Sequence, residues 1–148
     1  MNLYHIFRDR FEAHLDQPFL ISPGESVCSY GDIDRLSACF AAALRQEDIN
    51  ALDRVVVQVD KSAGAVALYL ACLRIGAVYV PLNVAYTAAE VAYFLSDAAP
   101  SLFVCRPESA DQLDGVASQA GVPVTRTLGT SMDGSFGHLA HKDRKSVV

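Results

Sequence analysis

Polar side chains stand at three places where short apolar segments end, and they are the first candidates for chemistry. The apolar segments cover 54–59, 78–82 and 102–105, and each has the length of a strand. If the strands are parallel, the polar residues meet at one edge, because ligands in such sheets bind beyond the carboxyl ends of the strands. The candidates are Asp60, Lys61, Ser62, the segment Asn83 to Thr87, and Arg106.

Each of these candidates also has a structural explanation. Asp60 and Ser62 can cap the helix that follows, Asn83 suits a turn, and Arg106 can be a solvated surface charge. The residue types alone favour these structural roles and leave a binding role open.

The cysteines and histidines are not spaced as metal ligands. The chain has four of each and no Cys-x-x-Cys motif. Cys39 and Cys72 fall on apolar faces of predicted helices, where a thiol packs as a small hydrophobic group. We therefore expect four buried, reduced cysteines and no metal site, with a disulfide set or a zinc site as the alternative. Asp32 and Asp34 are explained as first-turn charges of a helix, not as metal ligands.

The elements that would position these residues alternate along the chain. Short apolar strands joined by helices indicate right-handed crossovers and a parallel sheet covered on both faces. The sequence therefore predicts an α/β fold with a doubly wound, mostly parallel sheet, preceded by a helix at 3–15, a short β-hairpin at 19–30 and a helix at 30–46. The expected order is strand 54–59, helix 62–76, strand 78–82, helix 87–99, strand 102–105, helix 108–121 and strand 122–127.

Several helix ends carry specific signals. Ser62 is a candidate cap at the start of one helix, and Gly76 stands just past its end, where a left-handed residue is favoured. Thr87 and Glu90 have the spacing of a capping box.

Composition and missing motifs exclude several function classes. The net charge of −5 and the lack of a basic run argue against nucleic-acid binding. No apolar segment reaches the length of a membrane helix, and the N-terminus does not resemble a signal peptide, so we expect a cytoplasmic protein. The chain has no dinucleotide fingerprint, Walker-type phosphate loop or Gly-x-Ser-x-Gly elbow. On the residues alone, no catalytic apparatus is visible.

The order of the segments carries a resemblance to a known superfamily. "SYGDIDRLSACFAAALR", followed by "DRVVVQVDKSAGAVALYLACLRIGAVYVPLNVAYTAAEVAYFLSDAAPSLFVC", resembles the N-terminal part of the acyl-adenylate-forming enzymes, which include acyl-CoA synthetases and the adenylation domains of peptide synthetases. "VQVDKS", "LYLACLRIGAVYVPLN" and "AYTAAEVAYFLSDAAP" are most similar to the malonyl-CoA synthetase branch. The resemblance covers about residues 3–124.

This resemblance implies a two-step reaction for a full-length parent enzyme. A carboxylic acid, with malonate expected, attacks ATP to give an acyl-adenylate, and CoA then displaces AMP. ATP, Mg²⁺ and CoA are implied for the parent, whereas the Gly/Ser/Thr-rich loop and the lysine that the chemistry needs are expected downstream of this chain. We therefore expect no catalytic residue and no bound cofactor here. Asn83, Val84 and Tyr86 are candidates for a pocket wall near the CoA and acyl entry path, with turn and packing duty as the alternative.

The last part of the chain is expected to differ in origin. We assign residues 1–128 to a partial N-terminal AMP-binding domain and 129–148 to a linker remnant and tail. Asp143 to Val148 can be back-translated as the start of a common sequencing adapter, so these residues are predicted to be non-native and the chain a truncated gene model. The alternatives are a fragment of a peptide-synthetase-type adenylation domain and a non-catalytic binding module.

Overall fold

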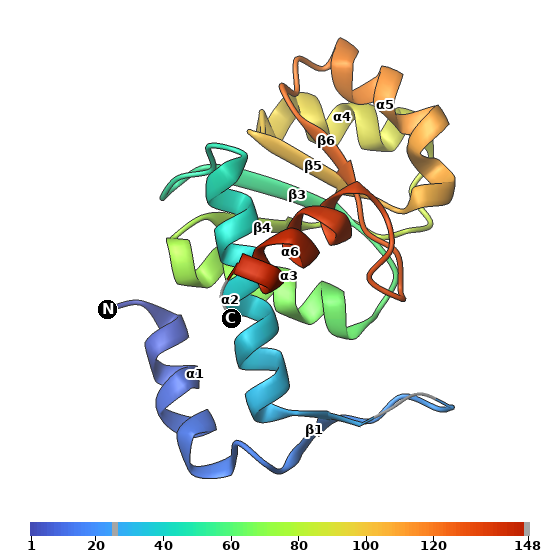
Figure 1. Cartoon of the computed structure of the whole chain (residues 1–148). Helices are drawn as coiled ribbons and strands as arrows, with labels where there is room; N and C mark the ends of the chain where they lie inside the picture. The colour runs from blue at the N-terminus through green and yellow to red at the C-terminus, as the bar shows by residue number, and fades with distance from the viewer. Residues whose placement is uncertain (25–26, 147–148) are drawn as a thin grey trace.

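A four-stranded parallel sheet lies at the centre of the chain (Figure 1). The computed structural model describes residues 1–24 and 27–146. The strands lie in the order β4-β3-β5-β6, with all three neighbouring pairs parallel. Their bounds are β3 (Arg54–Gln58), β4 (Val78–Pro81), β5 (Leu102–Cys105) and β6 (Thr125–Thr127). The doubly wound α/β prediction is confirmed.

Helices cover both faces of this sheet (Figure 1). One face carries α2 (Tyr30–Gln46), α3 (Ala63–Ile75) and α6 (Ser135–Ser146). The other face carries α4 (Ala88–Ala98) and α5 (Ala110–Gln119), which is preceded by the short helix η2 (Pro107–Ser109). The sheet is therefore the middle of three layers.

Alternation along β3 and β5 divides the core in two. Val55 and Val57 point into the cluster with α2 and α3, whereas Val56 points into the cluster with α4 and α5. Leu102 and Phe103 of β5 divide in the same way, and all five side chains are buried. Because successive side chains of a strand point to opposite faces, a continuous apolar run is what a sheet covered on both sides requires.

The N-terminal segment packs beside α2. It consists of α1 (Leu3–Phe11), η1 (Glu12–His14), β1 (Pro18–Leu20) and β2 (Cys28–Ser29). The two strands are antiparallel, so the predicted hairpin is confirmed, with shorter strands than expected. Phe11, Phe19 and Tyr30 pack ring against ring and attach this segment to the start of α2.

The capping signals are confirmed. Ser62 accepts a hydrogen bond from the Ala65 amide at 3.1 Å, and Thr87 and Glu90 form a complete capping box at α4. Gly76 ends α3 with φ of 77°, a conformation that is strained for any residue with a Cβ.

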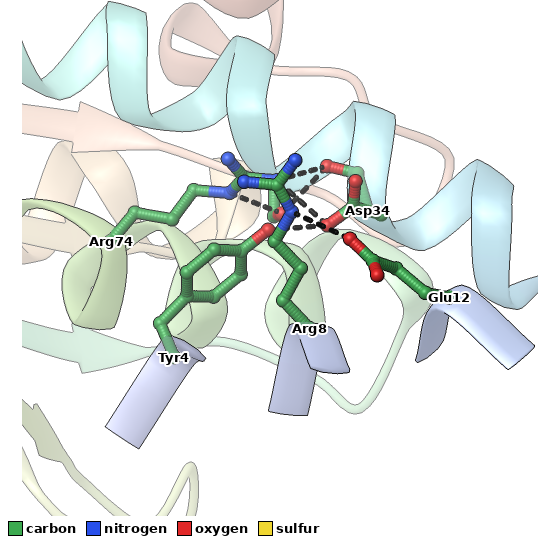
Figure 2. A network of polar contacts seen from close by, with 6 residues as sticks. Tyr4, Arg8, Glu12, Asp34 and Arg74 are labelled. Carbon is green, nitrogen blue, oxygen red and sulfur yellow. Dashed lines mark hydrogen bonds and ion pairs between the residues drawn. The ribbon is translucent and has the colours of Figure 1, made fainter. Parts of the chain in front are cut away.

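Asp34 differs from its predicted role. Asp32 is the first-turn charge and forms a capping box with Ser29, but Asp34 lies further along α2 and contacts other helices. Its carboxylate accepts hydrogen bonds from Tyr4 and from Arg74 (Figure 2). The first-turn explanation is therefore correct for Asp32 and wrong for Asp34.

The cysteines follow the prediction only in part. All four are free thiols, but Cys72 and Cys105 are buried whereas Cys28 and Cys39 are half-buried. Burial raises the pKa of Cys72 to about 12.

Helix α6 was not predicted from the sequence. Phe136 is fully buried and meets Phe40 of α2 edge to face, with ring centroids 5.1 Å apart. Gly137 is also buried, and a Cβ there would collide with the carbonyl oxygen of Met132. The segment that follows β6 is therefore packed onto the core. The predicted boundary at residue 128 and the adapter origin of residues 143–148 stay predictions, and residues 147–148 lie outside the described part.

Among the described residues, no helix combines the length and the apolar character needed to cross a membrane.

Candidate functional site at the carboxyl edge of the sheet

The winding of the sheet changes direction at β3. The helix that follows β3 packs on one face, whereas the helices that follow β4 and β5 pack on the other. Loops that diverge in this way leave room beyond the carboxyl ends of neighbouring strands, where ligands bind in this class of fold. The candidate site is therefore the set of residues that follow β3, β4 and β5.

Gln58 fixes the loop after β4. It is the last residue of β3 and only 3% exposed, and its Nε2 donates to the Asn83 carbonyl oxygen at 2.8 Å. The Tyr86 amide donates to the same oxygen at 3.1 Å. A buried amide without a partner would be costly, so these bonds hold the loop in one conformation. Sequence reasoning missed Gln58, although a single amide side chain in an apolar strand was the available signal.

The Asn83 side chain stabilises the turn after β4. Its Oδ1 accepts from the Ala85 amide at 2.9 Å, as asparagine does when it closes a tight turn, while the side chain remains exposed. Pro81 pairs with Val57 as the last residue of β4, and the next ladder bond comes from the Leu82 amide to Val57 at 2.8 Å. Proline thus occupies an edge strand, where its missing amide is tolerated.

The other two candidates for a pocket wall, Val84 and Tyr86, lie on the same loop. Tyr86 stacks on Phe94 of α4 with centroids 5.1 Å apart and remains 36% exposed, and Val84 is half-buried. Asn83, Val84 and Tyr86 therefore lie on one short loop whose backbone is fixed and whose side chains reach solvent. The structure supports the turn role directly, and the pocket-wall role stays a prediction.

Asp60 and Arg106 face each other across the ends of β3 and β5. Arg106 Nη1 lies 3.8 Å from Asp60 Oδ1, and Arg106 Nε lies 4.0 Å from Glu108. Arg106 Nε is buried and has no hydrogen-bond partner among the described residues. Because a buried N–H usually has an acceptor, this unpaired donor distinguishes Arg106 from a freely solvated side chain. It is thus more than the solvated charge that the sequence suggested.

Two other edge residues have surroundings that favour structural roles. Ser62 caps α3, where its hydroxyl oxygen accepts a hydrogen bond from the Ala65 amide. Cys105 ends β5, and burial, followed by the charge of Asp114, raises the pKa of its thiol to about 11. A thiol that stays protonated near neutral pH is a poor nucleophile. The edge therefore offers hydrogen-bond donors, acceptors and an aromatic surface, which suit binding.

Comparison with known proteins shows to which family the chain belongs. The family model for "AMP-binding enzyme" matches residues 7–146. The chain belongs to the AMP-binding enzyme family. The match covers the sheet, its helices and the candidate edge, so the superfamily resemblance is confirmed.

Individual relatives agree with this assignment. The crystal structure of ATP-bound MatB from Rhodopseudomonas palustris superposes with a TM-score of 0.80 at 34% identity, covering 95% of this chain and 27% of that one. The 3-hydroxybenzoate–CoA ligase of Aromatoleum sp. (strain CIB) is 32% identical over 108 residues, which are 73% of this chain and 20% of the ligase. A probable non-canonical peptide synthetase, CymA of Salinispora arenicola, is 32% identical over 122 residues, which are 82% of this chain and 1% of the synthetase. This chain thus spans about a quarter or less of the length of these relatives.

Proposed function

We propose that the chain is part of an enzyme that joins a carboxylic acid to CoA at the expense of ATP. The observation that carries this proposal is the family match over residues 7–146, which takes in every strand of the parallel sheet. The family includes CoA ligases, among them the 3-hydroxybenzoate–CoA ligase of Aromatoleum. In the proposed reaction, a carboxylate oxygen attacks the α-phosphate of ATP and pyrophosphate leaves. The CoA thiolate then attacks the acyl carbon and AMP leaves.

We propose malonate as the acid. Support comes from "VQVDKS", "LYLACLRIGAVYVPLN" and "AYTAAEVAYFLSDAAP", which resemble the malonyl-CoA synthetases, and from the 34% identity with MatB. Measuring the full-length enzyme against malonate, a monocarboxylate of similar size and 3-hydroxybenzoate tests this choice. Preference for either of the other acids would contradict it.

A second candidate is an adenylation domain that loads a carrier protein. The 32% identity with CymA and the 33% identity with the antimetabolite synthetase AmbB favour it. Incubating the full-length enzyme with its acid, ATP and either CoA or a phosphopantetheinylated carrier protein distinguishes the two. A free thioester of CoA supports the ligase, and acyl transfer to the carrier supports the alternative.

We propose that this part of the enzyme positions the substrates and supplies no catalytic residue. The loop from Asn83 to Tyr86 would form a wall of the entry path for CoA or acid, and Arg106 would supply a charged donor at the same edge. ATP, Mg²⁺ and CoA would be held with residues outside this chain. We accordingly propose that the 148-residue polypeptide alone, in the cytoplasm, neither adenylates an acid nor binds a cofactor. Exchange of labelled pyrophosphate into ATP by the purified chain would overturn this.

The wall role is tested with Tyr86→Ala in a full-length enzyme that carries this segment. Loss of an aromatic contact with a substrate is expected to raise KM for CoA or acid about three- to tenfold with little change in kcat. Tyr93→Ala is the matched control, because Tyr93 contacts the same Phe94 ring but is 67% exposed on α4. Equal KM values for wild type and Tyr86→Ala would leave only the packing role.

A further inference from the structure

A hollow lined by arginines lies between α1, α2 and α3, away from the candidate site. Its lining residues are Tyr4, His5, Arg8, Ala38, Ala41, Arg45 and Arg74. The three arginines come from three different helices, and the two alanines of α2 leave space between them. None of the residues that line the hollow carries a carboxylate, so the lining is cationic.

Arg74 forms the fixed side of this hollow, and Figure 2 shows its polar contacts. Its Nη2 donates to the Asp34 carboxylate at 2.8 Å and to the Asp34 carbonyl oxygen at 2.9 Å, and its Nε donates to the Ser37 hydroxyl at 2.9 Å. Its guanidinium also lies 4.1 Å from the centre of the Tyr4 ring. Asp34 therefore largely neutralises Arg74 and holds both Tyr4 and Arg74 in place.

Arg8 and Arg45 supply charge that is not neutralised in the same way. Arg8 Nε lies 3.8 Å from Glu12, but both side chains are more than half exposed, so this ion pair contributes little. Among the described residues, no acidic side chain forms an ion pair with Arg45, which is exposed near the end of α2. Two guanidinium groups with free donors thus face a hollow whose far side is already rigid.

We propose that this hollow binds a small phosphate-type anion. Guanidinium groups bind phosphate oxygens through paired, charge-assisted hydrogen bonds, so two free arginines suit this ligand. The hollow has a volume of about 230 Å³, below the roughly 300–1,000 Å³ of pockets for drug-sized ligands. It therefore has room for inorganic phosphate or pyrophosphate.

This anion site is separate from the carboxyl edge. Helix α3 begins after Ser62 at that edge and ends at Ile75 before the start of β4. Arg74 is in its last turn, so the 13 residues of α3 place the hollow about 20 Å from the edge, at 1.5 Å per residue. The anion would contact α1, the second half of α2 and the end of α3, and not the loop at 83–87.

The test is an NMR titration of the isotopically labelled 148-residue chain with pyrophosphate and, separately, with inorganic phosphate at constant ionic strength. We expect saturable shifts of amide signals in α1, the second half of α2 and the end of α3. The anion with the lower dissociation constant is the one that we assign to the hollow. Arg45→Gln and Arg8→Gln should each raise the dissociation constant about tenfold, the effect of losing one charge-assisted hydrogen bond. Arg10→Gln is the control, since it removes the same charge from α1 outside the hollow.

Several results would overturn the proposal. Shifts that grow linearly without saturation, or that chloride reproduces, would show general screening only. Equal weakening by Arg10→Gln and Arg45→Gln would show that net charge, and not the hollow, attracts the anion. Saturable shifts confined to residues 60–62, 83–87 and 106 would place binding at the carboxyl edge instead. All substituted arginines are exposed, and the spectrum of each variant reports whether it remains folded.

Discussion

Glu47 and Arg126 form a two-pronged ion pair that ties the end of α2 to β6. Arg126 Nε lies 3.0 Å from Glu47 Oε1 and Arg126 Nη2 lies 3.1 Å from Glu47 Oε2. The Glu47 side chain is 10% exposed and that of Arg126 is 35% exposed. The two residues are 79 positions apart in the chain, so the pair connects a helix on one face with an edge strand of the sheet.

We predict that Arg126→Ala destabilises the fold, because it leaves a nearly buried carboxylate without its partner. The partial solvent exposure of Arg126 reduces the effect. We expect a loss of about 1–3 kcal/mol in the free energy of unfolding, measured by urea denaturation. Arg35→Ala is the control: its ion pair with Asp32 is exposed, and its loss should change stability by no more than about 0.5 kcal/mol. Equal effects of the two variants would contradict the role of the Glu47 pair.

Phe136→Ala tests whether α6 is part of the packed core. Removing a fully buried phenyl ring that contacts Phe40 should cost about 3–5 kcal/mol. His138→Ala, on the exposed side of the same helix, should stay within about 0.5 kcal/mol of wild type. Urea midpoints of the three proteins provide the measurement, and a neutral Phe136→Ala would mean that α6 is not docked in solution.

The capping box of α4 predicts a specific response to acid. The amide hydrogen bond from Thr87, followed by its hydroxyl bond, lowers the pKa of Glu90 below its ordinary value of 4.5. The charge of Glu90 therefore stabilises the folded state above pH 4.5, and this contribution is lost as the pH falls through the lower folded-state pKa.

Glu90→Gln isolates this effect, because glutamine keeps the capping geometry without the charge. The Tm of wild type should exceed that of Glu90→Gln at neutral pH, and the difference should shrink as the pH falls below 4.5. A difference that is constant across this range would show that the charge is not responsible. Removing the cap itself with Thr87→Ala should cost about 1 kcal/mol at neutral pH.

Tyrosines and thiols that are wholly or partly buried predict a loss of stability in alkali. Burial, followed by the charge of Cys72, raises the pKa of Tyr79 from 10.0 to about 12. The unfolded chain then loses its proton before the folded chain does, so stability is complete below pH 10 and declines as the pH rises toward 12. Tyr4, with a pKa raised to about 12 by burial and by its bond to Asp34, acts in the same direction.

Tyr79→Phe should flatten the decline in urea midpoint above pH 10, because phenylalanine packs in the same place and has no proton to lose. Tyr93→Phe serves as the control, since it makes the same substitution at a side chain that is 67% exposed. An identical slope for wild type and Tyr79→Phe would contradict the prediction.

Local signals in the sequence were sufficient for the strands of the central sheet and for helices α2 to α5. The Thr87–Glu90 capping box, the Ser62 cap and Gly76 each act within a few residues, so their spacing predicts the helix ends correctly. Apolar runs predicted β3 and β5, because the sheet is covered on both faces there and polar residues do not alternate with apolar ones.

Contacts between distant residues were not predictable in this way. Helix α6 contains Gly137 and two histidines, which are weak helix formers, and its main anchor is Phe40, far away in the chain. Asp34 looked like a helix-dipole charge because Tyr4 and Arg74, its partners, come from two other helices. At the candidate site, the turn at Asn83 could be predicted from its residue type, whereas its attachment to Gln58 required the register of two strands.

The bond from Gln58 to Asn83 engages a main-chain oxygen, which any amino acid at position 83 would provide. The course of the polypeptide at this edge therefore does not depend on the identities of Val84 and Tyr86. Substitutions at these two positions, by evolution or in a saturation library, would change the surface of the loop while the backbone beneath keeps its form.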